Sequence, residues 1–293
     1  MPIASVLTGA LVWGLMWYPY RAAQDAGVSG SLATLTTYLL AMLCGAFMLP
    51  RVWRELRSDN RGRTGWWTSG LVLSAGWANL GYVLAILHGE VMRVLLLFYL
   101  APLWTILFSY WLLDERLNRY GYLIIFLSFG GAVVMLWKPQ LGLPLPGNFA
   151  EWIGLSAGMA FALSNVVSRR AAHLSVESKA YSVLLGTVLL AAPLLWWQGG
   201  MQSQLLAINA QIWLLLGLLG IVLYATSFTV QYALAHLPAN RAIILFLFEL
   251  VVAAISSYFL AYEAMQLRDW IGALLIVFAS LLSGKLYGKD RAQ

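Results

Sequence analysis

The side chains best suited to chemistry in this chain lie inside long apolar segments. Asn79 and Tyr82 are three residues apart, and Tyr224, Ser227 and Gln231 follow one another at i, i+3 and i+7. At these spacings each set shares one face of a helix. Neutral amides and hydroxyls on such a face either bind a solute or join helices by hydrogen bonds, and both roles are open for any single residue.

Glu249 is the only ionisable side chain placed well inside an apolar segment. A charge in that position is costly and usually faces a cavity or a partner. One interpretation is proton or cation handling, since a carboxyl group can hold a proton when buried and release it when wetted. The other is a structural hydrogen bond, with Asn79, Asn165 or Gln231 as the partner. No second embedded acid or histidine completes a proton relay.

Aromatic residues form a second candidate set. Trp13 and Trp17 lie four residues apart and could form one wall of an aromatic pocket, with Phe98, Tyr99 and Phe246 contributing from other segments. A tryptophan in mid-segment is expected to point inward, where its indole N–H can find a partner. Ordinary packing is the alternative.

These residues must be positioned by membrane-spanning helices. Of all residues, 61% are hydrophobic and only 10% are charged, far from the composition of a soluble domain. Ten apolar stretches reach the length of a span, so we predict an all-α polytopic membrane protein with ten transmembrane helices. The predicted spans are 3–22, 31–49, 66–87, 94–113, 119–137, 151–169, 179–197, 211–235, 242–262 and 268–286.

The chain repeats itself at an offset of 148 residues. The segment from Arg93 to Glu115 returns from Arg241 to Glu263, and Asn79 has Ser227 as its equivalent. Five spans in each half predict two inverted five-helix repeats with a binding site between them near the membrane midplane. The expected units are 1–138 for the first repeat, 139–150 for an outer linker, 151–287 for the second repeat and 288–293 for a cytoplasmic tail.

The distribution of basic residues predicts the orientation. All but four of the 18 Lys and Arg residues fall in one set of alternating connections, the exceptions being Arg21, Arg93, Lys138 and Arg268. Both termini are therefore predicted to be cytoplasmic. The net charge of +6 is attributed to this anchoring and not to nucleic-acid binding. The single cysteine, Cys44, excludes an internal disulfide framework and a cysteine metal site.

Proline distinguishes the two halves. Pro102 lies in the middle of the fourth span, where it removes a backbone donor and should kink the helix. Its equivalent in the ninth span is Leu250. We therefore expect the ninth span to be straighter than the fourth.

Two motifs carry a family resemblance. LFYLAPLWTILFSYWLLDERL and LFLFELVVAAISSYFLAYEAM, in corresponding positions of the two halves, resemble the drug/metabolite transporter superfamily in its EamA-type exporter branch. The interior aromatics are similar to those of the bacterial aromatic and general amino-acid exporters. The resemblance implies alternating access around a central cavity, with no ATPase subunit. It departs from the family where Glu249 is followed by Leu250 in place of proline.

We therefore predict a secondary transporter of the bacterial inner membrane that exports small metabolites, with amino acids as the expected substrate class. Export of lipophilic cations or drugs is an alternative that uses the same aromatics and Glu249 as counter-ion. An intramembrane enzyme is disfavoured, since no span holds a paired-acid, His-rich or Ser/His set, and a channel would need a charged ring or filter. No cofactor, metal or nucleic acid is expected, and the partners are the solute and membrane lipids. The predicted substrate-binding residues are Trp13, Trp17, Asn79, Tyr82, Tyr99, Asn165, Tyr224, Ser227, Gln231 and Phe246, with Glu249 as the coupling candidate.

Overall fold

The computed structural model describes residues 1–58, 63–89, 91–137, 145–199, 204–205, 208–260 and 266–283. Within these ranges the chain forms helices and no strand, as the all-α prediction requires. The first half contains α1 (Pro2–Asp25), α2 (Gly30–Cys44), the short 3-10 helix η1 (Ala46–Met48), α3 (Leu49–Ser58), α4 (Arg63–His88), α5 (Val91–Phe98), α6 (Ala101–Leu113) and α7 (Arg119–Leu136). The second half contains α8 (Phe149–Arg170), α9 (Val176–Gln198), α11 (Ala210–His236), α12 (Ala239–Phe246), α13 (Phe248–Leu260) and α14 (Leu267–Leu282).

Most of the predicted spans meet the requirements for crossing a membrane. Among the described residues, seven helical stretches are long and apolar enough, or eight if α2 and the segment Ala46–Glu55, bent by 51° from it, form one span. The predicted first and tenth spans correspond to α1 and α14, which are outside this set. A multi-pass membrane protein follows, and the number of ten spans stays a prediction.

Five helices begin where a short polar side chain replaces a missing backbone partner. In each case a Ser or Asn oxygen accepts a hydrogen bond from a backbone N–H in the first turn, which satisfies a donor that the helix itself cannot. The capping residues are Ser29 for α2, Asn118 for α7, Asn148 for α8, Ser175 for α9 and Asn209 for α11. These caps lie in the connections, so they fix where each apolar segment starts.

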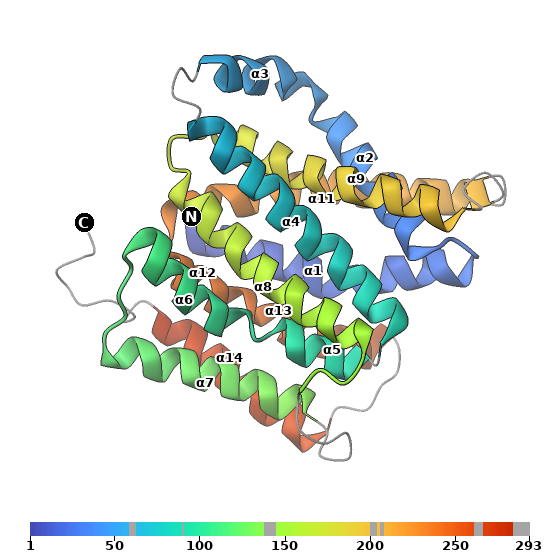
Figure 1. The fold of residues 1–293 in the computed structure, drawn as a ribbon. Coiled ribbons are helices and arrows are strands. Elements are labelled where there is room, and N and C mark those ends of the chain that lie inside the picture. The colour runs from blue at the N-terminus through green and yellow to red at the C-terminus, as the bar shows by residue number, and fades with distance from the viewer. Residues whose placement is uncertain are drawn as a thin grey trace.

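Helices of one half pack mainly against helices of the other half (Figure 1). The third predicted span, α4, packs along α8 and α9, and its equivalent, α11, packs along α1 and α2. Likewise α6 packs against α8 and α13 against α1, while α7 and α14 pack against each other. Such an exchange of partners is the arrangement that a two-fold axis between the repeats produces.

The fourth and ninth predicted spans are both interrupted. The first breaks at Tyr99 and Leu100, just before Pro102 in the first turn of α6. The second breaks at Leu247, between α12 and α13, although no proline is present. The fourth span is thus interrupted over two residues where Pro102 predicts a kink, and the ninth is interrupted over one residue. That the ninth span is the straighter of the two stays a prediction. There the chain makes a local i+3 bond from Leu250 N to Leu247 O (3.1 Å), so a single tightened turn is enough to interrupt the helix.

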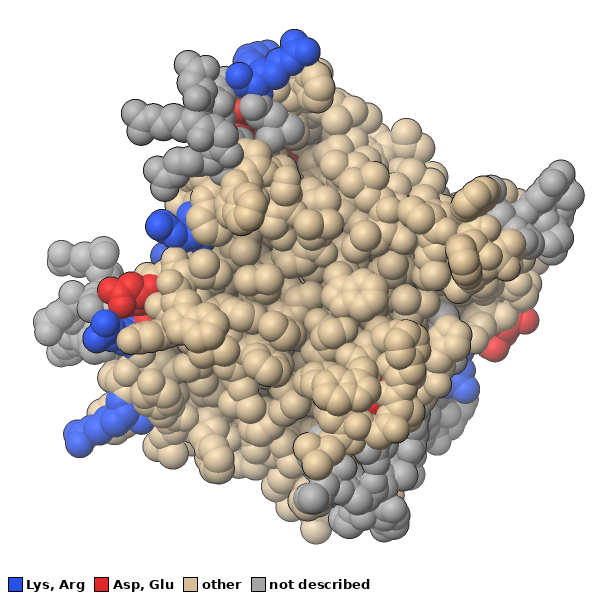
Figure 2. Space-filling model, viewed as in Figure 1, with Lys and Arg blue, Asp and Glu red and all other residues tan. Residues whose placement is uncertain are grey.

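The surface has a broad uncharged band. In Figure 2 charged side chains gather at the left and right of the visible face, and almost none lies between them. Large apolar side chains are exposed on the helices, among them Trp111 (68%), Phe126 (74%) and Leu214 (66%). A band of this kind fits contact with lipid and not with water. In Figure 1, α1 begins and α14 ends at the same, left edge of the fold.

Candidate functional site

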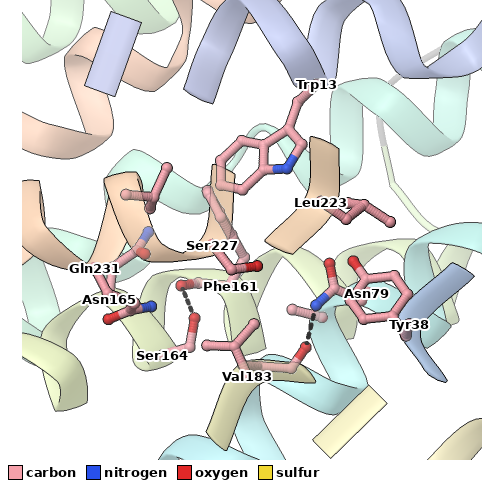
Figure 3. Close-up of a pocket in the computed structure, with 13 residues that line it drawn as sticks. Trp13, Tyr38, Asn79, Phe161, Ser164, Asn165, Val183, Leu223, Ser227 and Gln231 are labelled. Atoms are coloured by element: carbon pink, nitrogen blue, oxygen red, sulfur yellow. Dashed lines mark hydrogen bonds between the residues drawn. The ribbon is translucent and has the colours of Figure 1, made fainter. Parts of the chain in front are cut away.

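A cavity lies at the centre of the helices, between the two halves (Figure 3). It is formed by three helices of the first half, α1, α2 and α4, and by their three counterparts α8, α9 and α11. The volume of the cavity is only about 40 Å³, room for a few water molecules. A solute of amino-acid size would need the helices to move apart. The lining residues are Trp13, Tyr38, Ala75, Ala78, Asn79, Phe161, Ser164, Asn165, Val183, Leu223, Ser227, Val230 and Gln231.

Five of the predicted site residues line this cavity: Trp13, Asn79, Asn165, Ser227 and Gln231. The repeat equivalents Asn79 and Ser227 thus enter one cavity from α4 and α11. None of the lining side chains is Lys, Arg, Asp or Glu. Recognition in the cavity therefore depends on neutral dipoles and aromatic surface.

Asn79 is held in place by two hydrogen bonds. Its Nδ2 donates to the Ala75 carbonyl oxygen (2.9 Å) and to Thr187 Oγ1 on α9 (3.1 Å). Glycines allow α4 and α9 to come this close: a Cβ on Gly76 would lie 2.4 Å from the Gly186 carbonyl oxygen, so no larger residue fits without a shift. The helix crossing thus places Thr187 beside Asn79.

Two further amides come from α8 and α11. Ser168 Oγ donates a short hydrogen bond to Gln231 Oε1, which joins α8 to α11 beside the cavity. Asn165 is 3% exposed, and its Nδ2 has no partner among the described residues. Figure 3 shows both amides at one end of the cavity, with Asn79 and Tyr38 at the other.

An aromatic cluster adjoins the cavity. Trp13 meets Phe161 edge-on at 6.0 Å between ring centroids and lies 5.3 Å from Phe246. The Phe161 ring packs against Phe98 at 5.5 Å between centroids, and the Phe98 ring packs against Tyr82 at 5.0 Å. Phe246, which is 1% exposed, therefore supports the cavity wall from behind, and Tyr82 lies at the far end of the cluster.

Glu249 lies beyond this cluster, in the first turn of α13. Its carboxyl group has Tyr99 as a hydrogen-bond partner, and the Tyr82 hydroxyl lies close enough to interact with it electrostatically. The side chain is partly exposed. Tyr82, Tyr99 and Glu249 form a second polar group separate from the cavity. The break before α13 favours an acid here, because a helix N-terminus stabilises negative charge.

The two remaining predicted residues have partners elsewhere. Trp17 Nε1 donates to Ser256 Oγ (2.9 Å), which joins α1 to α13. The Tyr224 hydroxyl donates to Met48 Sδ (3.4 Å), and its ring packs on Phe47 at 6.4 Å between centroids. Neither residue lines the cavity.

Sequence reasoning did not select Tyr38, Phe161, Ser164 and Thr187 for the site. One signal was present: Phe161 is the repeat equivalent of Trp13 at the offset of 148 residues. The two rings meet across the cavity wall, so applying the repeat to the aromatics would have found it. Tyr38 carries no such signal, because Gly186 stands at its equivalent position. Among the described residues no three His, Cys, Asp or Glu side chains come together in a way that could hold a metal ion.

Comparison with known proteins identifies the architecture. The model of the EamA-like transporter family matches twice, over residues 1–137 and 148–284. An uncharacterized transporter of Archaeoglobus fulgidus is 30% identical over 205 residues, which are 69% of this chain and 70% of that one. The uncharacterized transporter YojE of Bacillus subtilis is 24% identical over about half of each chain, 50% and 51%. A protein of known crystal structure superposes with a TM-score of 0.72, at 20% identity and over 96% of both chains, which supports the fold alone.

Proposed function

Because the chain belongs to the EamA-like transporter family, we propose that this multi-pass membrane transporter exports small zwitterionic metabolites, amino acids above all. Access to the cavity would alternate between the two sides of the membrane, with the two repeats moving against each other. We place it in the bacterial inner membrane. Both termini are cytoplasmic in this proposal, in accord with the basic connections.

The cavity itself is the observation that carries the proposal. It lies between three helices of each repeat, and its lining offers neutral amides, hydroxyls and the rings of Trp13, Tyr38 and Phe161. A phosphorylated solute would need embedded Lys or Arg, which this lining does not provide. A zwitterion carries no net charge and has both donors and acceptors, so it fits such a site.

Counterflow in proteoliposomes tests the proposal. Vesicles loaded with one amino acid should accumulate the same labelled compound, and Trp13→Ala should reduce the rate by about tenfold, because the loss of one cavity wall removes roughly 1.4 kcal/mol or more of binding. Trp111→Ala, at a lipid-facing position that is 68% exposed, is the control and should transport normally. Counterflow of cationic dyes without any amino acid would favour the drug-export alternative and contradict this proposal.

The proposed topology has a separate test. Gln24 and Arg54 are both exposed. Gln24 follows the predicted first span and Arg54 follows the predicted second span, so they lie on opposite sides of the membrane. In a Cys44→Ala background, a membrane-impermeant thiol reagent applied outside whole cells should label Gln24→Cys and leave Arg54→Cys unlabelled. The reverse pattern would place the termini outside.

Glu249 is the candidate for coupling transport to a proton gradient. It is an acid inside a span, with Tyr99 as its hydrogen-bond partner, and an embedded acid of this kind often takes part in proton transfer. Glu249→Gln should then abolish gradient-driven accumulation and preserve exchange, because exchange needs no net proton movement. Normal behaviour of Glu249→Gln in both assays would reduce Glu249 to a structural hydrogen-bond partner.

A further inference from the structure

One end of the cavity presents hydrogen-bond donors. The Gln231 Oε1 accepts a hydrogen bond from the Ser168 hydroxyl, and its Nε2 is the donor that this amide can offer to a ligand. Beside it, the Asn165 Nδ2 is buried and meets no acceptor in the described part of the chain, although an unpaired buried donor is costly. Figure 3 shows the two amides adjacent. We call Asn165 and Gln231 the donor end.

The opposite end presents an acceptor. Both of the hydrogens on Asn79 Nδ2 are in use, one with the Ala75 carbonyl and one with Thr187, and this fixes the orientation of the amide. Its Oδ1 receives no hydrogen bond from the described residues. Thr187 is also a hydrogen-bond partner of the Tyr38 hydroxyl, so Tyr38 helps to hold Thr187 in place beside Asn79. We call Asn79 the acceptor end.

From this polarity we propose that the cavity is a receptor for the α-amino acid backbone in one fixed orientation. The substrate carboxylate accepts hydrogen bonds from Asn165 and Gln231, and its ammonium group donates to Asn79 Oδ1. The substrate side chain then faces Trp13 and Phe161, which favours apolar and aromatic amino acids. The inference rests on the proposed function, because it assumes that this cavity is the transport site.

The chemistry follows from what the lining lacks. With no ionised residue in the cavity, a net charge would be desolvated without a counter-ion, whereas the opposite charges of a zwitterion compensate each other. Hydrogen bonds to charged groups are the stronger kind, so each end should discriminate against a ligand that lacks its partner group. The site should therefore reject compounds that carry only one of the two charges.

The test is competition with labelled phenylalanine counterflow by three unlabelled compounds. These are phenylalanine, phenylalaninamide, which has no carboxylate, and 3-phenylpropionate, which has no ammonium group. The parent protein should bind phenylalanine at least tenfold more tightly than either analogue. Gln231→Leu and Asn165→Leu should weaken phenylalanine and 3-phenylpropionate about tenfold and leave phenylalaninamide nearly unchanged.

Variants at the acceptor end should give the opposite pattern. Asn79→Leu should weaken phenylalanine and phenylalaninamide and spare 3-phenylpropionate. Because this variant also removes the bond to Thr187, Asn79→Asp is the second variant: it keeps an acceptor oxygen, adds a negative charge and should strengthen phenylalaninamide at least tenfold. Thr187→Val is the matched control. It removes the hydrogen bond to Asn79 Nδ2 and leaves Asn79 Oδ1 in place, so it separates the loss of that bond from the loss of the acceptor oxygen.

The outcomes separate this inference from the proposed function. Two results would overturn the proposed orientation of the substrate and leave amino-acid transport intact. One is that every variant weakens the binding of all three compounds equally, and the other is that Asn79→Asp does not gain affinity for phenylalaninamide. Absence of counterflow for every amino acid tested in the parent protein, with the protein folded, overturns the proposed function itself.

Discussion

The second helices of the two repeats, α9 and α2, begin in the same way but with different chemistry. Glu55 of α3 accepts hydrogen bonds from Ser175 N (2.8 Å), Ser175 Oγ (2.6 Å) and Ser178 Oγ at the start of α9. At the start of α2, Gln204 Oε1 accepts one from Ser29 N (3.0 Å). At the repeat offset, position 204 corresponds to 56, next to Glu55. In each repeat, the segment that follows the second helix caps the second helix of the other repeat.

The two capped starts lie at opposite ends of a helix pair. Ser31 Oγ in the first turn of α2 donates to Gln198 Oε1 at the last residue of α9 (2.6 Å), so α2 begins where α9 ends. With the proposed topology, the carboxylate cap is on the cytoplasmic side and the amide cap on the outer side. An ion pair between Arg51 and Glu177 (2.7 Å) adds to the former. The two contacts thus share a geometry, but Glu55 accepts three hydrogen bonds with a carboxylate, and Gln204 accepts one with a neutral amide.

Removing the inner cap should have the largest effect. Glu55→Ala takes away an acceptor of three hydrogen bonds and leaves the Ser175 N–H and two hydroxyls without it, so the free energy of unfolding should fall by about 2 kcal/mol. Thermal unfolding of the detergent-purified protein measures this. No change in the transition temperature would show that α3 is not fixed to α9.

Neutralising the inner cap should have a smaller effect. Glu55→Gln keeps an acceptor oxygen and makes the inner contact resemble the outer one, so the loss should be about 1 kcal/mol. The same unfolding assay applies, with salt varied as well. If the negative charge of Glu55 stabilises the contact, the difference in the free energy of unfolding between Glu55→Gln and the parent shrinks at high salt. A difference that does not change with salt would contradict this role of the charge.

Removing the outer cap should cost less than removing the inner one. Gln204→Ala loses one neutral hydrogen bond, so a decrease of about 0.5–1 kcal/mol is expected. A loss equal to that of Glu55→Ala would abolish the contrast between the two ends.

The smallest effect is expected at Pro102. The ninth span is interrupted at Leu247 without a proline, so the break in the fourth span should persist in Pro102→Ala. We expect the stability to change by about 0.5 kcal/mol at most and the transport rate by less than twofold. A collapse of transport with normal folding would show that the proline itself distinguishes the repeats.

These comparisons also show what the sequence could reveal. Apolar run lengths located most helices to within a few residues, and the 148-residue offset brought Asn79 and Ser227 together. Residues 50–58, expected as part of a connection, belong to the amphipathic helix α3, and contacts of Glu55 hold this helix against the start of α9. Periodicity gives the face of a helix but not its partner. Trp17 therefore could not be assigned to Ser256 in advance, nor Tyr38 to the cavity.

Accessibility of the cavity from both sides of the membrane tests the central claim most directly. Ser227 lines the cavity, so Ser227→Cys in a Cys44→Ala background can be treated with an impermeant methanethiosulfonate reagent in right-side-out and inside-out vesicles. Gln24→Cys and Arg54→Cys report the orientation of each preparation. Alternating access predicts that Ser227→Cys reacts from either side, and that a saturating amino acid slows both reactions. Reaction from one side only, unaffected by every amino acid tested, would contradict it.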